Sequence, residues 1–243
     1  MLPMARLDAV LFDIDDTLFS TTEFAQRARR ASVEAMVAAG LDADPDQVLE
    51  ELGEIIGEFS SNYDRHFDQL LKRVKPEGLG GRNPAIIVAA GIVAYHDTKY
   101  RELKPFDDVL PLLEGIERAG LRRGIVTHGW TTKQAEKLVR LGLVPHLDAD
   151  AIFISDQIGI AKPNPKLYLA ALRQMGLPPK RVMYVGDSPQ HDIAPPKSLG
   201  MVTVWSERAA KHRLEGTGIE PDHVVSDFEQ LRQILRDEYA VPL

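Results

Sequence analysis

Nine residues near the start of the chain, Ala9-Val10-Leu11-Phe12-Asp13-Ile14-Asp15-Asp16-Thr17, decide the predicted fold. Four apolar residues followed abruptly by acids are typical of a buried parallel strand whose carboxyl end opens onto solvent. Because side chains two positions apart share one face of an extended chain, we expect Asp13 and Asp15 to converge on one point. Two carboxylates at such a short distance repel each other unless a cation lies between them or one of them is protonated. The stretch therefore predicts a divalent-metal site; a strand end with a plain Asp-Thr turn is the alternative.

Three later segments repeat this pattern, in which a short apolar strand leads into a polar group. Residues 124–127 end in Thr127, Lys162 follows the strand at 152–154, and the strand at 181–185 runs into Gly186-Asp187 and on to Asp192. Open parallel sheets bind ligands in the crevice outside the carboxyl ends of their strands. Four such coincidences favour one site that handles phosphate and metal over ordinary turn chemistry.

The ordered set resembles the motifs of the haloacid dehalogenase superfamily, specifically its phosphatase-like members with a helical cap inserted after the first motif. Those motifs are Asp-x-Asp-x-Thr/Val, a strand-terminal Thr or Ser, a Lys, and Gly-Asp followed by a further acid. Here they match residues 13–17, Thr127, Lys162 and residues 186–192. The resemblance implies a doubly wound, Rossmann-like parallel α/β core with a helical cap domain. We expect residues 1–18 and 106–243 to form the core, and residues 19–105 the cap.

The pattern of helices and strands agrees with that division. From residue 108 onward, strands alternate with helices predicted at 108–119, 131–141, 165–175 and 227–238, as in right-handed βαβ units. Residues 19–105 break the alternation and read as helices at 22–39, 46–59, 63–74 and 84–101. The sequence Thr131-Thr132-Lys133-Gln134 matches a capping box, which predicts that the Thr131 and Gln134 side chains cap the helix that follows.

The amino-acid composition excludes several classes of protein and of functional site. A formal net charge of -7 without a basic block argues against nucleic acid as a partner. The absence of cysteine excludes disulfides, a thiolate nucleophile and a cysteine-based zinc site. No apolar run approaches the length of a membrane span, and the first strand is too short for a signal peptide. We therefore expect a cytoplasmic protein without membrane partners, either a monomer or a homodimer.

The resemblance also implies chemical roles for the first motif. Asp13 is the expected nucleophile, which attacks phosphorus and forms an aspartyl-phosphate. Asp15 is the expected general acid, protonating the leaving oxygen and later deprotonating the attacking water. The implied cofactor is Mg²⁺, since hard oxygen ligands favour it. Its predicted ligands are Asp13, Asp15 (through the backbone carbonyl), Asp187 and Asp192, the last acting through water or by supporting Lys162.

The remaining motifs are expected to bind the phosphoryl group. Thr127 is predicted to hydrogen-bond a phosphoryl oxygen, helped by the loop of His128 and Gly129. His128 replaces the Asn that family members usually carry. The Lys162 ammonium is predicted to balance the charge of Asp13 and of the transferring phosphoryl group.

These inferences lead to a Mg²⁺-dependent phosphomonoester hydrolase acting on a small phosphorylated metabolite. A 2-haloacid dehalogenase, a phosphosugar mutase and a catalytically idle phosphate-binding module remain as alternatives. Asp15 and Asp187 argue against the dehalogenase, because the enzymes it would resemble need no metal and lack the second carboxylate. Within the predicted cap, Arg82 and Asn83 are candidate substrate contacts, because they follow the glycine-rich segment 78–81, which is expected to move.

Overall fold

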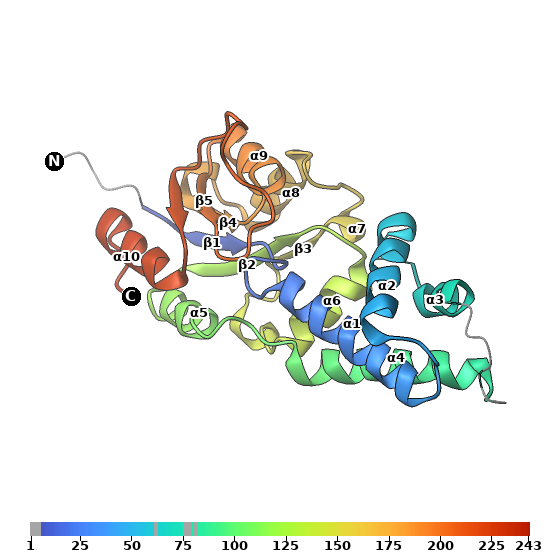
Figure 1. Ribbon diagram of the computed structural model, residues 1–243. Coiled ribbons are helices and arrows are strands. Elements are labelled where there is room, and N and C mark those ends of the chain that lie inside the picture. Colours follow the sequence, from blue (N-terminus) through green and yellow to red (C-terminus); the bar gives the residue numbers. More distant parts are fainter. Residues whose placement is uncertain (1–5, 61–62, 75–78, 80–81) are drawn as a thin grey trace. The chain divides into compact units, whose positions relative to one another are not determined.

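The computed structural model describes residues 6–60, 63–74, 79 and 82–243 (Figure 1). The chain divides into two compact units, of which one comprises Met1–Thr21 with Lys104–Leu243 and the other Thr22–Leu103. The helical unit thus begins at Thr22 rather than at residue 19, and ends at Leu103 rather than at residue 105. That this unit acts as a cap stays a prediction.

The larger unit is built on a six-stranded parallel sheet with the order β3-β2-β1-β4-β5-β6 (Figure 1). Strand β1, at the centre, pairs with β2 and β4, so that Ala9 lies opposite both Arg122 and Val182. Because all strands run in parallel, the residues that follow them meet at one edge. This sheet confirms the α/β fold class predicted from the sequence. The strands are β1 (Ala9–Phe12), β2 (Arg122–Thr127), β3 (Ile152–Ile154), β4 (Val182–Gly186), β5 (Val202–Ser206) and β6 (His223–Val225).

Helices cover both faces of the sheet. On one face, Leu167 and Tyr168 of α8 pack with Leu11 and Tyr184 in a buried apolar cluster. On the other face, Phe12 meets Phe228 of α10 edge to face, with ring centroids 6.0 Å apart. The helices predicted for this part of the chain begin and end within one residue of those observed. They are α5 (Val109–Arg118), α6 (Thr131–Arg140), α8 (Lys166–Met175) and α10 (Phe228–Tyr239), and the short α7 (Ser155–Ile158) and α9 (Ala194–Ser198) lie between them.

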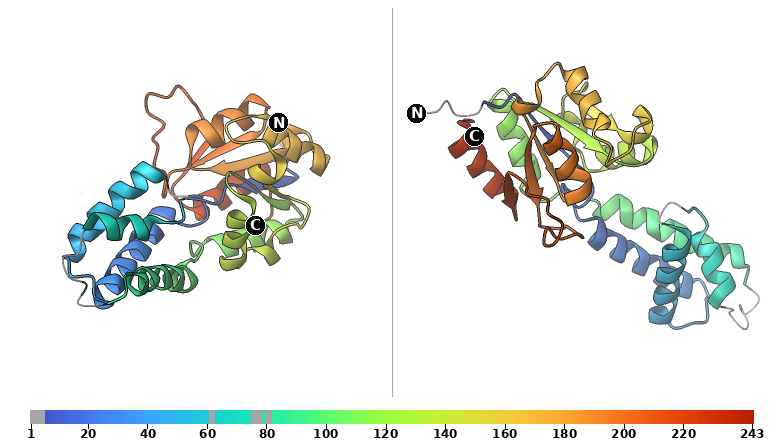
Figure 2. Two further views of the ribbon diagram at one scale, coloured as in Figure 1. Left: turned by 90° about the vertical axis from the view of Figure 1, so that its right-hand side faces the viewer. Right: turned by 90° about the horizontal axis from the view of Figure 1, so that it is seen from above.

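The smaller unit consists of α1 (Thr21–Ala38), α2 (Pro45–Phe59), α3 (His66–Val74) and α4 (Pro84–Glu102), shown from two further sides in Figure 2. Local sequence explains where α2 begins, because the Asp44 side chain accepts hydrogen bonds from the backbone of Asp46 and Gln47. No strand occurs among the residues described in this unit. Its apolar core comprises Val33, Met36, Leu41, Val48, Leu52, Ile55, Leu70 and Ile87.

The predicted capping box of α6 is wrong. The helix begins at Thr131, but its first turn is held by Asp156 of α7, whose Oδ2 accepts from the Thr131 backbone N–H at 3.0 Å and from the Thr131 hydroxyl at 2.7 Å. The hydrogen-bond acceptor at the start of α6 is therefore a residue from another helix. The Gln134 side chain does not cap α6 and makes other contacts, described below. None of the helices in the described part of the chain combines the length and apolar content that crossing a membrane requires.

Candidate active site

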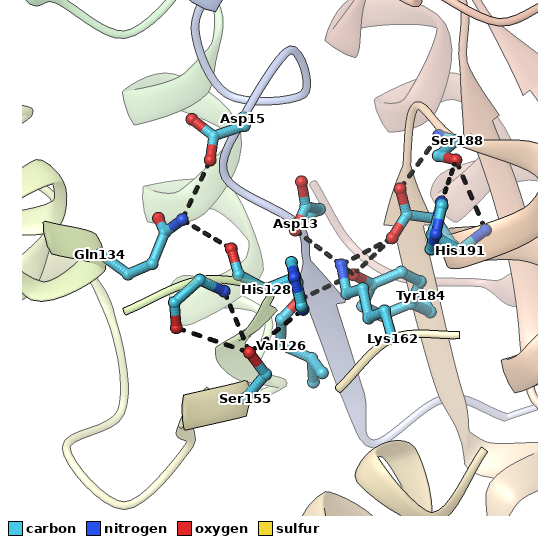
Figure 3. Close-up of polar contacts among 12 residues, drawn as sticks. Asp13, Asp15, Val126, His128, Gln134, Ser155, Lys162, Tyr184, Ser188 and His191 are labelled. Carbon is cyan, nitrogen blue, oxygen red and sulfur yellow. Dashed lines mark hydrogen bonds and ion pairs between the residues drawn. The ribbon is translucent and has the colours of Figure 1, made fainter. Parts of the chain in front are cut away.

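The Lys162 ammonium lies at the centre of a buried cluster at the carboxyl edge of the sheet (Figure 3). Its Nζ donates to Asp13 Oδ1 at 2.6 Å, to Asp192 Oδ1 at 2.6 Å and to the Tyr184 hydroxyl at 2.8 Å. The Tyr184 hydroxyl in turn donates to the Val126 carbonyl at 2.8 Å. The segment after β3 thus supplies the ammonium, and strand β4 with the segments that follow β1 and β4 supplies the groups that fix it.

Asp192 reaches this cluster through a π-helical turn, Pro189–Ile193, that follows β4. The turn brings the side chain back over the strand end, where Asp192 Oδ2 accepts from the Ser188 backbone N–H at 3.0 Å. The close approach depends on Gly186, because a Cβ at that position would lie 2.4 Å from the Asp192 Cβ. Real Cβ atoms do not come that close, so the strand end requires glycine.

We expect Gly186→Ala to displace Asp192 and thereby weaken its hold on Lys162. The overpacking should lower the free energy of unfolding by about 1–3 kcal/mol, measured by urea denaturation. Gly53→Ala is the matched control, because nothing lies within 4 Å of the added Cβ, in the middle of α2. That control should stabilise the protein by about 0.5–1 kcal/mol. Equal effects of the two changes would contradict this account of Gly186.

The cluster carries more negative charge than its ammonium balances. Carboxylate oxygens of Asp13, Asp187 and Asp192 lie within 4.8 Å of one another, and all three side chains are buried. Burial raises the pKa of Asp13 to about 7, although Lys162 opposes the shift. Burial also raises the pKa of Asp187 to about 8, and the charges of Asp192 and Asp13 add to it. Such a surplus of hard oxygen donors suits a divalent cation.

The three acids differ in how many of their carboxylate oxygens already accept hydrogen bonds from the protein. Asp192 uses Oδ1 for Lys162 and Oδ2 for the Ser188 backbone. Asp13 contacts Lys162 through Oδ1. These contacts match the role of Asp192 as a support for Lys162 better than that of a direct metal ligand. Asp13 and Asp187 are the better-placed side chains for a cation.

Asp15 does not join this cluster, and the expectation that it converges on Asp13 is wrong for this structure. Figure 3 shows its carboxylate pointing toward Gln134 and away from Asp13. The chain turns after Ile14, since the backbone N–H of Leu18 donates to the Ile14 carbonyl at 3.0 Å, so Asp15 lies in this turn and not in the extended strand. The alternation of an extended strand therefore stops one residue too early. The predicted use of the Asp15 carbonyl as a metal ligand stays a prediction.

The Asp15 carboxylate has its own cation. Both of its oxygens lie 2.6 Å from Lys137 Nζ, and they also accept from Gln134 Nε2 and the Thr21 hydroxyl at 3.1 Å each. Burial alone would raise the pKa of Asp15, but the Lys137 charge and these hydrogen bonds hold it below the ordinary value. Asp13 and Asp15, two residues apart, therefore have opposite electrostatic environments.

Strand β2 ends at Thr127, whose side chain faces the site. The Thr127 hydroxyl is buried and makes no hydrogen bond to any residue that the structure describes, so it remains available to a ligand. The Gly129 backbone N–H instead donates to the Ser155 hydroxyl at 3.0 Å, and Ser155 Oγ also lies 3.2 Å from His128 Nδ1. Burial, followed by the positive charge of Lys162, lowers the pKa of His128. A substrate contact by the Gly129 N–H, as predicted, would have to replace the bond to Ser155.

Comparison with known proteins identifies the family. A family model described as haloacid dehalogenase-like hydrolase matches residues 7–200. The chain belongs to this family. A glyceraldehyde 3-phosphate phosphatase of Methanopyrus kandleri is 42% identical over 225 residues, which cover 92% of each protein. Another, from Methanocaldococcus jannaschii, is 36% identical over 95% of this chain and 98% of that one. The crystal structure of an HAD phosphatase from Thermococcus onnurineus has a TM-score of 0.64 and 25% identity, over 96% of this chain and 100% of that chain.

Four side chains of this haloacid dehalogenase-like site were not predicted from the sequence: Gln134, Lys137, Ser155 and Tyr184. One signal was present for the first two, since they lie three residues apart on a helix that begins just after the Thr127 loop and so share one face. No local pattern pointed to Ser155 or Tyr184, because the residues that they contact in the site are distant in the chain.

The predicted substrate contacts in the helical unit have structural roles within that unit. Asn83 precedes α4, and its Oδ1 accepts from the Ala85 backbone N–H at 2.9 Å. The Arg82 side chain packs against Gly40, where a Cβ would lie 2.2 Å from Arg82 Nη1. Their contact with substrate stays a prediction. Of the segment 78–81 that precedes them, Gly78, Gly80 and Gly81 lie outside the described residues.

Proposed function

We propose that this chain is a Mg²⁺-dependent phosphomonoester hydrolase that works through an aspartyl-phosphate, with a triose phosphate such as glyceraldehyde 3-phosphate as substrate. The observation that carries the proposal is the buried cluster in which Lys162 joins Asp13 and Asp192 beside Asp187. A carboxylate fixed by an ammonium, with surplus acids for a cation, suits attack on a phosphoryl group. The two glyceraldehyde 3-phosphate phosphatases, similar over nearly their whole length, support the substrate.

The proposed reaction has two steps. In the first, an Asp13 oxygen bonds to phosphorus while the bond to the leaving oxygen breaks, and Asp15 gives a proton to that oxygen. Because the Lys137 charge lowers the pKa of Asp15, this role requires Asp15 to leave Lys137 and take up the proton before the step. In the second, water attacks the phosphorus, Asp15 takes a proton from the water, and the bond between phosphorus and Asp13 breaks to release inorganic phosphate. Lys162 balances the charge of Asp13 and the phosphoryl group, and the unpaired Thr127 hydroxyl donates to a phosphoryl oxygen.

The acidic cluster fits the proposed metal. Asp13 and Asp187, with the backbone carbonyl of Asp15, would hold Mg²⁺, and Asp192 would support the site through Lys162. When bound, Mg²⁺ supplies the positive charge that lets an anionic substrate approach the Asp13 carboxylate. Burial raises the pKa values of Asp13 and Asp187, and the charges of the neighbouring acids raise them further, so a bound cation would favour their ionised forms.

Magnesium should stabilise the protein more as the pH rises. In the folded, metal-free protein the pKa is about 7 for Asp13 and about 8 for Asp187, against 3.8 for an ordinary carboxyl. Because the folded-state values are raised, stability without metal is greatest at low pH and is lost as the pH rises through these values. Mg²⁺ binds the deprotonated carboxylates, so the gain in Tm caused by Mg²⁺ over EDTA should grow from about pH 5.5 to about pH 8.5. A gain that is independent of pH would contradict this explanation.

A panel of phosphate esters tests the function. We expect Mg²⁺-dependent release of phosphate, fastest from glyceraldehyde 3-phosphate among sugar phosphates, phosphoglycolate and nucleoside monophosphates, measured against an enzyme-free blank. No release from any ester would overturn the proposal. Release of chloride from 2-chloropropionate in EDTA would instead indicate a dehalogenase. An isomeric phosphate formed without free phosphate would indicate a mutase, and binding of a phosphate analogue without turnover an idle binding module.

A further inference from the structure

The Lys162 ammonium has one hydrogen-bond partner for each of its three hydrogens. Its Nζ donates to two carboxylates, those of Asp13 and Asp192, at 2.6 Å each. The third partner is the Tyr184 hydroxyl, at 2.8 Å. The two acids bring negative charge to this contact, whereas the hydroxyl is neutral. Tyr184 therefore contributes to the direction of the ammonium rather than to its charge balance.

The bonds of the Tyr184 hydroxyl leave it one orientation. A tyrosine hydroxyl has a single hydrogen, and an ammonium can only donate, so the Tyr184 oxygen must accept from Lys162. Its own hydrogen goes to the Val126 carbonyl at 2.8 Å, which can only accept. The Asp192 Oδ1 atom lies farther from the hydroxyl, at 3.3 Å, and already accepts from Lys162. The bond to Val126 thus turns a lone pair of Tyr184 toward the ammonium.

The Tyr184 side chain connects two strands across the centre of the sheet. Tyr184 belongs to β4 and Val126 to β2, and β1 lies between these strands. Asp13 follows β1 directly, and Thr127 follows Val126. The Tyr184 ring is fully buried and packs edge to face against Tyr168, with ring centroids 5.0 Å apart. Because close-packed interiors leave a buried ring little space to shift, the hydroxyl has a fixed position beside the end of β1.

We propose that Tyr184 is a positioning residue, which fixes the Lys162 ammonium against Asp13 by binding its third N–H group. The inference rests on the proposed function, in which Lys162 balances the charge of Asp13 and of the transferring phosphoryl group. A lysine side chain has a flexible four-carbon stem, so two carboxylates alone leave the ammonium free to shift between them. Tyr184 exchanges no proton and acts only through Lys162.

Tyr184→Phe tests this role, because it removes the hydroxyl and keeps the ring. We expect kcat for glyceraldehyde 3-phosphate in Mg²⁺ to fall about 10-fold, with KM within about twofold of the wild type. KM should change little because Thr127, the group proposed to bind the phosphoryl oxygen, stays in place. Tyr239→Phe is the matched control, since it removes a hydroxyl that lies 2.9 Å from His223 Nε2 in the same unit. It should leave both constants unchanged.

A double variant tests whether the hydroxyl acts through Lys162. If it does, its removal should have no effect in a protein that already lacks the ammonium. Lys162→Met combined with Tyr184→Phe should therefore hydrolyse p-nitrophenyl phosphate as fast as Lys162→Met alone. The enzyme concentration is raised until the slower protein gives a measurable rate. A further loss of about 10-fold in the double variant would reject positioning through Lys162.

Three results with Tyr184→Phe alone would also overturn the inference. The first is a wild-type kcat, and the second is a raised KM with kcat unchanged. The third is a failure to fold, judged by near-ultraviolet circular dichroism, because the hydroxyl would then be required by the fold as a whole. All three leave the proposed function intact as long as the wild type releases phosphate. A wild type that hydrolyses no ester contradicts the proposed function and this inference with it.

Discussion

Asp13→Asn is expected to abolish phosphate release, lowering kcat by about a thousandfold or more. The amide keeps the size of the side chain but has no negative oxygen to attack phosphorus. Phosphate release in Mg²⁺ is the measurement, and intact mass after rapid acid quenching should show one added phosphoryl group in the wild type only.

The variant should still fold, because Lys162 retains its bonds to Asp192 and Tyr184 and the crowded cluster loses one of its charges. Its thermal unfolding in EDTA should therefore match or exceed that of the wild type. Asp107→Asn, an exposed carboxyl in the same unit, is the control and should keep full activity. Turnover by Asp13→Asn close to that of the wild type would remove Asp13 as the nucleophile.

Lys162→Met should produce the largest loss of stability. It leaves the buried carboxylates of Asp13 and Asp192 without their shared ammonium, next to the buried Asp187, and breaking a buried ion pair from one side costs about 3–5 kcal/mol. The loss should be greatest at about pH 8 and smaller at about pH 5, because the raised pKa values of the unpaired acids let them take up protons as the pH falls. Urea unfolding in EDTA at the two pH values measures both effects.

The exposed Lys166 provides the control, since Lys166→Met should change the free energy of unfolding by less than about 0.5 kcal/mol at either pH. A loss in Lys162→Met that is the same at both pH values would mean that packing of the lysine stem, rather than its charge, stabilises the cluster. Phosphate release by Lys162→Met should also fall, because the proposed chemistry uses the same ammonium.

Local patterns in the sequence were sufficient for most of the fold. An apolar run that ends in a polar residue marks the end of a buried strand wherever it occurs, so the ends of β1, β2 and β4 were predictable. Parallel pairing of these strands then places Asp13, Thr127 and Asp187 at one edge. Helix bounds were also local properties, as in α5, which spans Val109–Arg118 against a prediction of 108–119.

Predictions failed where a distant residue competed with a local partner. Asp156, from another helix, holds the Thr131 backbone and hydroxyl, so Gln134 does not cap α6. The released Gln134 side chain binds Asp15, 119 positions earlier in the chain. No window of sequence contains both partners, so neither contact had a local signal.

The sequence by itself determined that the chain forms a parallel α/β sheet, and it determined which acids follow its strands, because strand ends are read from adjacent residues. Only the tertiary structure decided which acids share a site. It brings Asp192 to Lys162 through the turn over Gly186, and it turns Asp15 toward Lys137, 122 positions away. The reason is electrostatic, because a buried carboxylate is most stable where a cation neutralises it. Here the cations are lysines far away in the sequence, which only the tertiary fold brings next to the acids.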